Sequence, residues 1–429
     1  MIQKKYINKK LHRFTHANIT VRKNRKIEEF IIRLRHRKHG PIEIVLPKFV
    51  RNKLQIKIGD NFEILKIRSV KQPKSPSKLI KRGFVDLLFL LPKKMTTGRN
   101  ITVDYEKDYI RLWSPKCQEV RIKRFVELDI VGKLFGLIQA ESAKKGNKFD
   151  FTSILYTIHK EFLSLLSSVT EINDLFFKCY LQYNPRISKP EAVKRALEFQ
   201  EITDLPSYKL TLVENSQTGD IPPVEIAIFN KLFNEIFLGI LENLRSYLMY
   251  KRLTDKEKIL GESFISRILT GDGTITVFNH KNHFTPYIKI FDIVERLKDY
   301  KKILINLGIT SRIDEKEFTL WLNCDWETAK YMYKIGAFEG HDLNRKKLLE
   351  SLINHAKTKS LSKLKIFSNR FLTFDNIAEL FSGKSATNYW LANRISEGYL
   401  KYNNNKYLLT KKGNDILTFI NSLNEKLIK

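Results

Sequence analysis

The chain has 429 residues, a length that predicts two or three domains. Of these residues 42% are hydrophobic and 11% aromatic, a composition typical of a folded protein. Its formal net charge of +31 indicates a polyanionic partner. Nucleic acid fits better than a membrane surface, because no basic amphipathic helix with an apolar anchoring face is evident. No apolar run reaches the ~20 residues that span a bilayer. Three widely spaced cysteines argue against a disulfide framework or a zinc site and favour a reducing, cytoplasmic location.

The positive charge is concentrated in the first 100 residues, which hold 27 lysines and arginines against 6 acidic residues. We predict a polar basic arm over residues 1–26 and a basic β-domain over 27–125. Within this domain, we expect a strand at 42–46, a helical turn at 48–53 after Pro47, and a strand at 61–67. This pattern resembles the swapped-hairpin transition-state regulators, which are dimeric. The alternative to this resemblance is an ordinary basic β-domain. The chain is accordingly expected to be a monomer or a homodimer formed through this domain.

The middle of the chain contains an internal repeat. After a linker rich in Lys, Ser and Pro at 71–78, further strands are expected up to about residue 125. From residue 127 the apolar residues follow a helical period, and a helix–strand–strand–helix pattern occurs twice. The repeats cover about 127–245 and 246–350.

Both repeats open with a helix that ends in an acidic residue. The first helix reads LFGLIQAES over residues 134–142 and the second ISRILTGDG over residues 265–273, so Glu141 and Asp272 each follow a small residue where a strand begins. These segments and the repeated pattern resemble the LAGLIDADG homing endonuclease family over residues 127–350. The resemblance implies an α+β fold with a pseudo-two-fold core.

In that family the two entry helices pack side by side, which requires small residues at their contact. Gly136 and Ala140 meet this requirement in the first helix, and Ser266 and Thr270 meet it less well in the second. Arg267 occupies the tight glycine position of the second helix, where a large side chain is predicted to push the helices apart. Ser142 replaces the glycine that follows the first acid.

The resemblance implies a Mg²⁺ site where the two helices end. Glu141 and Asp272 would be the catalytic metal ligands, assisted by the backbone carbonyls of Ala140 and Gly271. Helix C-termini favour cations, Mg²⁺ prefers oxygen ligands, and paired metals promote in-line phosphodiester displacement. The cofactor expected from this chemistry is Mg²⁺.

The resemblance also implies that the strands of each repeat contact the major groove of double-stranded DNA. Basic residues in or near these strands are the expected contacts, and they are Lys148, Lys178, Lys281, Lys289 and Arg312. The family's endonucleases often use a basic residue near the metals. Lys178, Lys289 and Arg312 are all candidates for that role.

The last part of the chain, residues 365–429, resembles a winged helix-turn-helix domain. Helices are expected at 374–381 and 385–397, and a hairpin is expected to turn at 403–405. An apolar face is assigned to the core, and it consists of Ile377, Ala378, Phe381, Leu391 and Ile395. The outward residues are the expected DNA contacts, and they are Lys384, Thr387, Asn388, Asn393 and Arg394. The alternative is a small helical domain that binds protein.

Three functions fit these features. The first is a site-specific, Mg²⁺-dependent endonuclease that acts on double-stranded DNA, favoured by the two acids. The second is a LAGLIDADG-derived transcription regulator without cleavage, favoured by the two extra DNA-binding modules and by Arg267. The third is an RNA splicing maturase, which makes RNA the alternative partner. No protein-splicing block flanks the core, so an intein is not expected.

Overall fold

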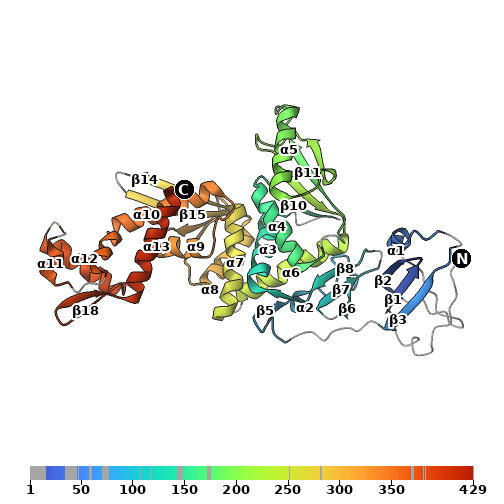
Figure 1. Ribbon diagram of the computed structural model, residues 1–429, viewed down its shortest axis with the longest axis horizontal. Helices are drawn as coiled ribbons and strands as arrows, with labels where there is room; N and C mark the ends of the chain where they lie inside the picture. The colour runs from blue at the N-terminus through green and yellow to red at the C-terminus, as the bar shows by residue number, and fades with distance from the viewer. Residues whose placement is uncertain are drawn as a thin grey trace. The chain divides into compact units, whose positions relative to one another are not determined.

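The computed structural model falls into two compact units, residues 1–272 with 298–308 and residues 273–297 with 309–429 (Figure 1). The residues that the structure describes are 16–33, 46, 48–57, 60–69, 77–106, 108–115, 117–142, 148–171, 175–250, 252–280, 283–368, 372–379, 381 and 383–428. Several predicted features lie outside these residues: Lys281, Pro47, most of the strand expected at 42–46, most of the linker and the first part of the expected arm. No helix in the described ranges is long and apolar enough to cross a membrane.

The first unit begins with a three-stranded antiparallel sheet in the order β2-β1-β3. Its elements are β1 (His16–Lys23), β2 (Lys26–Arg33), α1 (Lys48–Lys53) and β3 (Glu63–Ser69). Helix α1 confirms the turn expected at 48–53. Strand β1 corrects the expected arm: Ala17, Ile19 and Val21 alternate along it and are buried in one cluster with residues of α1, so this segment folds as a strand.

Two further small sheets lead to the repeat region, and they pair in the orders β4-β5-β9 and β6-β7-β8. Their elements are β4 (Ile80–Lys81), β5 (Phe84–Asp86), α2 (Leu87–Leu90), β6 (Thr102–Glu106), β7 (Tyr109–Trp113), β8 (Val120–Lys123) and β9 (Phe125–Glu127). The buried Asp86 carboxylate caps α2 by accepting from the Leu88 amide at 3.2 Å. It also pairs with Arg124 Nη2 at 2.7 Å, so one acid holds α2 and the segment between β8 and β9 together.

The first repeat contains a mixed four-stranded sheet in the order β10-β13-β11-β12, in which β11 and β12 are parallel. Its elements are α3 (Leu128–Glu141), β10 (Phe149–Ser153), α4 (Tyr156–Val169), β11 (Phe177–Tyr183), α5 (Lys189–Thr203), the 3-10 turn η3 (Ser207–Lys209), β12 (Leu210–Glu214), β13 (Val224–Ile228) and α6 (Lys231–Tyr250). Helix α4 separates β10 from β11, so the first repeat is more elaborate than a simple helix–strand–strand–helix order. Its buried residues Ile158, Phe162, Leu165 and Val169 recur at helical spacing.

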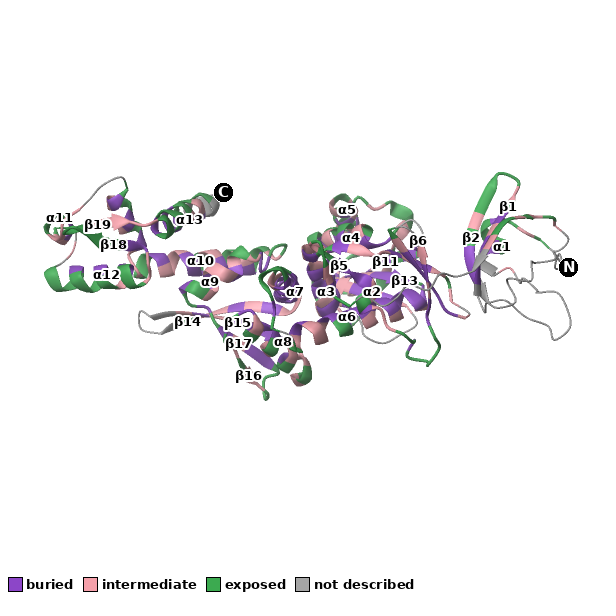
Figure 2. Ribbon diagram, turned by 90° about the horizontal axis from the view of Figure 1, so that it is seen from below, coloured by how far each residue is buried: buried purple, intermediate pink, exposed green. Residues whose placement is uncertain are grey.

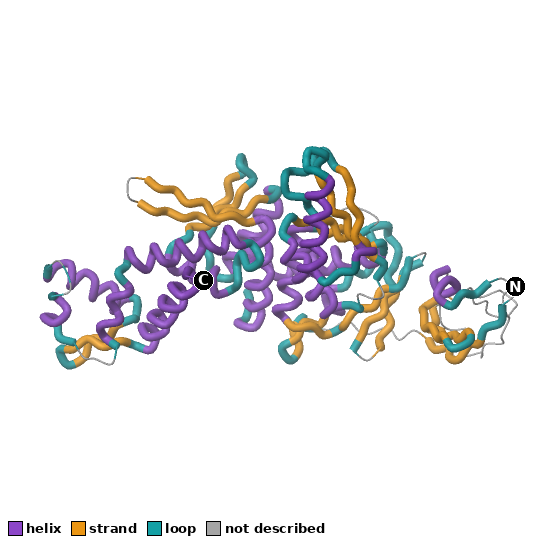
Figure 3. Tube along the Cα trace, turned by 45° about the horizontal axis from the view of Figure 1, so that its top comes forward, coloured by secondary structure: helices purple, strands orange, loops and turns teal. Residues whose placement is uncertain are grey.

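The second repeat follows the expected order more closely. Its entry helix is α7 (Asp255–Asp272), which belongs to the first unit. The elements that follow are β14 (Gly273–His280), β15 (His283–Phe291), α8 (Val294–Asn306), β16 (Arg312–Asp314), β17 (Thr319–Asn323) and α9 (Trp326–Lys334). The strands form an antiparallel sheet in the order β14-β15-β17-β16. In each repeat the strands form a layer beside helices (Figure 3).

The C-terminal part belongs to the second unit. Its elements are α10 (Asp342–Thr358), the 3-10 helix η4 (Leu361–Phe367), α11 (Phe374–Ala378), α12 (Lys384–Ser396), β18 (Leu400–Asn403), β19 (Lys406–Leu409) and α13 (Lys411–Ile428). The predicted hairpin is confirmed, and Asn404 and Asn405 adopt the positive φ angles that a tight hairpin turn requires. Trp326 Nε1 donates to the Tyr399 hydroxyl at 3.3 Å, which ties this part to α9.

Candidate metal site and nucleic-acid surfaces

Helices α3 and α7 are buried along most of their length and pack closely against each other (Figure 2). A Cβ atom added at Gly132 would lie 2.6 Å from the Leu260 carbonyl oxygen and 2.6 Å from Ser263 Cβ. One added at Gly136 would lie 2.4 Å from the Phe264 carbonyl oxygen. These distances are shorter than any van der Waals contact, so only glycine fits at these two positions of α3.

The two helices are in matched register. Gly132 meets Ser263, Gly136 meets Arg267, and a Cβ added at Gly271 would lie 2.6 Å from Ala140 Cβ. The two members of each pair are the same number of residues apart in the sequence, as are Glu141 and Asp272. The alignment of the two segments therefore holds without a slip.

Arg267 corrects one expectation, because it does not push the helices apart. Its Cβ lies beside Gly136, where the missing side chain leaves room for it. Its guanidinium leaves the contact and pairs with Glu161 Oε1 of α4, at 2.8 Å from Nε and 2.7 Å from Nη2. A large residue is tolerated here because its partner is glycine and its charge has a carboxylate.

Ser266 and Thr270 are also placed differently from the expectation. Both are fully buried, and their hydroxyls donate within α7, to the carbonyls of Ser263 and Ser266 at 3.0 Å each. The α7 residues that meet the small residues of α3 are Ser263, Arg267 and Gly271.

Replacing Glu161 with glutamine tests the Arg267 contact. The amide oxygen still accepts from the guanidinium but carries no charge, so we expect the free energy of unfolding to fall by about 1 kcal/mol. Urea unfolding measures the change. Glu201→Gln on the exposed side of α5 is the control and should be neutral. A neutral Glu161→Gln variant would mean that the ion pair does not stabilise the Arg267 side chain.

Glu141 and Asp272 are the last residues of α3 and α7. The Glu141 carboxylate lies against Gly271, whose added Cβ would be 3.1 Å from Oε1, so it borders the residue before Asp272. The Ser153 hydroxyl of β10 donates to Glu141 Oε1 at 3.1 Å. Burial raises the pKa of Glu141 to about 7, and the Ser153 hydrogen bond opposes this shift. The structure therefore brings the two predicted acids to the same end of one helix pair.

The chemistry of this helix end suits a hard cation. Glu141 is a largely buried carboxylate, and no basic side chain among the described residues pairs with it. A bound cation would favour its charged form. Ala140 and Gly271 belong to the last turns of their helices, whose carbonyls lack an intrahelical partner. No group of three or more His, Cys, Asp or Glu residues in the described ranges could hold a metal. A cation here would thus use two carboxylates, carbonyls and water, a set that Mg²⁺ accepts.

The basic residues predicted on the first sheet differ in their surroundings. Lys148 pairs with Asp150 Oδ1 at 3.0 Å and with Glu225, so two carboxylates neutralise its charge. Lys178 is exposed on β11. Its neighbours across the sheet are Ala227 on β13 and Asp150 in the same row on β10. Of the two lysines, Lys178 is the one whose charge is available to a phosphate.

The predicted basic residues of the second sheet lie on either side of a tryptophan. Lys289, Trp321 and Arg312 are paired across β15, β17 and β16 and lie on one face. Lys289 Nζ is 3.8 Å from the centroid of the Trp321 ring, and the Arg312 guanidinium carbon is 5.2 Å from it. Trp321 was not among the residues predicted from the sequence. The alternation of Thr319–Asn323, which places Trp321 between two buried leucines, is the signal that could have found it.

Two predicted contacts of α12 are corrected by their burial. Thr387 is fully buried and donates to the Gly383 carbonyl at 3.0 Å. Arg394 is 4% exposed, donates to the Lys359 carbonyl at 3.3 Å, and pairs with Glu397 at 3.1 Å. Both side chains therefore hold α12 in place instead of facing outward.

The outward face of α12 has a different composition from the predicted one. Lys384 and Asn388 are exposed, and Asn393 is half-buried. Tyr389, which was not among the predicted contacts, is 75% exposed on the same helix. Ile395, assigned to the core, is 38% exposed.

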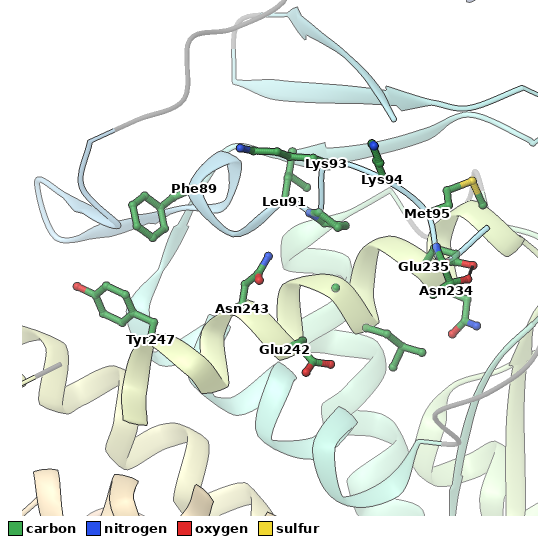
Figure 4. A pocket seen from close by; sticks show the side chains of 14 residues that line it. Phe89, Leu91, Lys93, Lys94, Met95, Asn234, Glu235, Glu242, Asn243 and Tyr247 are labelled. Carbon is green, nitrogen blue, oxygen red and sulfur yellow. Dashed lines mark hydrogen bonds between the residues drawn. The ribbon is translucent and has the colours of Figure 1, made fainter. Parts of the chain in front are cut away.

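A cavity of about 1140 Å³ lies between residues 89–96 and α6 (Figure 4). Phe89 and Tyr247 border one end, and Met95 and Glu235 border the other. Glu235 accepts hydrogen bonds from the amide and hydroxyl of Thr96, at 2.8 and 2.6 Å. Neither Glu141 nor Asp272 lines this cavity, which is therefore separate from the candidate metal site.

No protein-family model matches the chain, and no curated protein matches it. Similar solved structures include I-DmoI in complex with DNA and Mn, which is 15% identical and covers 49% of this chain and 97% of its own, with a TM-score of 0.28. The N-terminal LAGLIDADG domain of DUF199/WhiA is 15% identical over 49% of this chain and 81% of its own, with a TM-score of 0.26. Full-length DUF199/WhiA from Thermatoga maritima is 10% identical, and the match covers 70% of this chain and 92% of that protein, with a TM-score of 0.29. At such low scores and identities, these likenesses assign no function to this chain.

Proposed function

We propose that this chain is a site-specific double-stranded DNA-binding protein of the LAGLIDADG type that cleaves its target with Mg²⁺. The observation that supports this most is the matched register of α3 and α7, which ends both helices in a carboxylate at one end of their contact. The net charge of +31 supports a polyanionic partner.

In this proposal Glu141 and Asp272 are the metal ligands, and the carbonyls of Ala140 and Gly271 assist them. A divalent cation bound there would lower the pKa of a coordinated water and neutralise charge on the scissile phosphate. Ser153 orients the Glu141 carboxylate through its hydrogen bond. Gly271 lets the two helix ends approach, because any larger residue would collide with Ala140.

The test has two stages. Duplexes that bind the full-length protein are selected from a random library, and the selected site is then incubated with the protein in Mg²⁺ or in EDTA. We expect sequence-selective binding in both conditions and cutting of both strands only in Mg²⁺. Binding without Mg²⁺-dependent cutting would reject cleavage and leave the regulator as the function.

The regulator remains a second candidate because the C-terminal part has the element order of a winged helix. Leu372 forms an isolated antiparallel bridge with Tyr407 of the hairpin, and α11 and α12 lie between them in sequence. We propose that α12 enters the major groove, with Lys384 and Asn388 as contacts and Tyr389 beside them.

Arg394 and Lys384 should respond differently to alanine. Arg394→Ala removes one of two donors to the Lys359 carbonyl, which Trp390 Nε1 also contacts at 3.1 Å, and one of two basic partners of Glu397, so we expect a loss of about 1 kcal/mol in the free energy of unfolding. Lys384→Ala should leave stability within about 0.5 kcal/mol and weaken duplex binding several-fold. Urea unfolding and gel-shift titration measure the two effects. An Arg394→Ala variant with unchanged stability and weaker DNA binding would restore Arg394 as a contact.

A further inference from the structure

The outer face of the second sheet carries a cluster of three aromatic side chains, Phe278, Tyr287 and Trp321, which we call the aromatic platform. The Phe278 and Trp321 rings are nearly parallel, with an interplanar angle of 18° and centroids 6.5 Å apart. The Tyr287 ring meets them edge-on, with centroids 5.8 Å from Phe278 and 5.6 Å from Trp321. The three residues come from three neighbouring strands, so the sheet itself holds the rings in place.

The platform is not part of the hydrophobic core. On β15 and β17 the residues that alternate with it are fully buried, and they are Ile288, Ile290, Leu320 and Leu322. Phe278, by contrast, is 42% exposed. Tyr287 and Trp321 are half-buried. None of the three rings is fully buried, so packing in the core does not by itself explain why this face is aromatic.

Two cations border the platform. Lys289 and Arg312 both lie against the Trp321 ring, at 3.8 and 5.2 Å from its centroid. Asp314, an acid on β16 two residues from Arg312, accepts from the amides of Lys316 and Glu317 in the turn between β16 and β17. The face thus combines aromatic rings with positive charge.

The outer face of the first sheet has a different character. Its central residues are Thr152, Glu225 and Tyr180, paired across β10, β13 and β11. Gln182 Nε2 donates to Glu225 Oε2 at 2.9 Å, and Lys148 is neutralised on the same face. The platform is therefore specific to the second repeat among the two sheets.

Aromatic rings beside cations suit unpaired nucleotides better than a duplex. In a duplex the bases remain stacked and offer only their edges in the grooves, which polar side chains read. An unpaired base exposes its π-face, which stacks on aromatic side chains, while nearby cations hold the phosphates.

We propose that the aromatic platform binds unpaired nucleotides of single-stranded DNA or RNA, with bases stacked on its rings and phosphates beside Lys289 and Arg312. This site is independent of the proposed metal site, because it rests on residues of the second sheet only. It replaces the duplex contact expected of Lys289 and Arg312 from the sequence, because both cations lie against Trp321 and are assigned here to the phosphates of an unpaired strand.

Fluorescence anisotropy with the full-length protein tests the site. The probes are labelled oligo(dT) and oligo(rU) of about 12 nucleotides, a length within the range of known single-strand sites, and a blunt duplex. Trp321→Ala should weaken single-strand binding by about 5-fold to 100-fold, the effect of losing one stacked base. Duplex binding should change by less than about 3-fold. The two homopolymers distinguish DNA from RNA as the source of the unpaired strand.

Matched variants separate stacking from folding. Trp321→Phe keeps a ring and should retain most of the affinity, and Phe278→Ala provides a second loss at an exposed position. Tyr250→Ala is the control, because Tyr250 is 76% exposed on α6 and also lies under a lysine, Lys302 at 5.1 Å. The control should leave single-strand binding unchanged.

Four outcomes would overturn the proposal. Three of them are the absence of single-strand binding by the wild-type protein, a parallel loss of duplex and single-strand binding in Trp321→Ala, and an equal loss in Tyr250→Ala. The fourth is retained single-strand binding by both Trp321→Ala and Phe278→Ala. If Trp321→Ala does not unfold cooperatively and is therefore misfolded, Phe278→Ala takes its place in the comparison.

Discussion

Asp272→Asn and Glu141→Gln, made separately, are each expected to lower the rate of Mg²⁺-dependent cutting of the selected duplex by more than about 100-fold. Losing only an outer-shell partner of a metal ligand already costs about 10- to 100-fold, so losing a ligand charge should cost at least as much. The amides are close in size to the acids, so both helices should keep their packing. Duplex binding should therefore stay within about threefold of the wild type.

Asp255→Asn is the matched control for these variants. Asp255 is also a carboxylate of α7, but it lies at the start of the helix, and its side chain is 98% exposed. Its replacement should change neither cutting nor binding. Cutting that persists in both Asp272→Asn and Glu141→Gln would show that another site performs the chemistry. Cutting restored in Asp272→Asn by Mn²⁺ would instead support a direct ligand role.

The candidate metal site could be predicted from the sequence because its signal is local. A helix that ends in an acid after a small residue, and recurs at a constant spacing, fixes which positions can meet. The structure keeps that spacing at Gly132, Gly136 and Ala140. The order of elements in the second repeat was equally readable, since its apolar period changes clearly between helix and strand.

Other features depend on tertiary contacts that no local pattern contains. From the sequence, Arg267 is predicted to push the two helices apart. In the structure its guanidinium pairs outside the helix contact with Glu161, which lies 106 positions away in the chain. On α12, the carbonyl of Lys359 and the carboxylate of Glu397 decide that Arg394 faces inward. The strand β1 was missed because it is short, ends in Arg22 and Lys23, and lies between basic segments, so it resembles a continuation of the basic arm.

The aromatic platform illustrates a different limit. Alternation places Trp321 on the face opposite to the buried leucines, and this much was available from the sequence. Its neighbours, however, are set by the register of β14, β15 and β17. Without that register, Phe278, Tyr287 and Trp321 are three separate aromatic residues.

Gly136→Ala is expected to lower the free energy of unfolding by about 2 to 3 kcal/mol, as measured by urea denaturation. The added methyl would lie 2.4 Å from the Phe264 carbonyl oxygen, a backbone atom that moves only if α7 moves. Overpacking of this kind costs about 1 to 3 kcal/mol, and the contact with backbone favours the upper part of that range. The gain of about 1 kcal/mol in helix propensity offsets only part of the cost.

Gly261→Ala is the matched control, because it adds the same methyl within α7. Its nearest atoms are side-chain methyls of Leu253 and Leu307 at 3.3 Å, which can shift, so stability should change by less than about 1 kcal/mol. Since α3 and α7 carry Glu141 and Asp272 at their ends, a displacement of one helix should also slow cutting. Gly136→Ala should therefore lose both stability and cutting, whereas Gly261→Ala should keep both. Full stability in Gly136→Ala would mean that the two helices can separate without cost, and their contact would no longer explain the position of the acids.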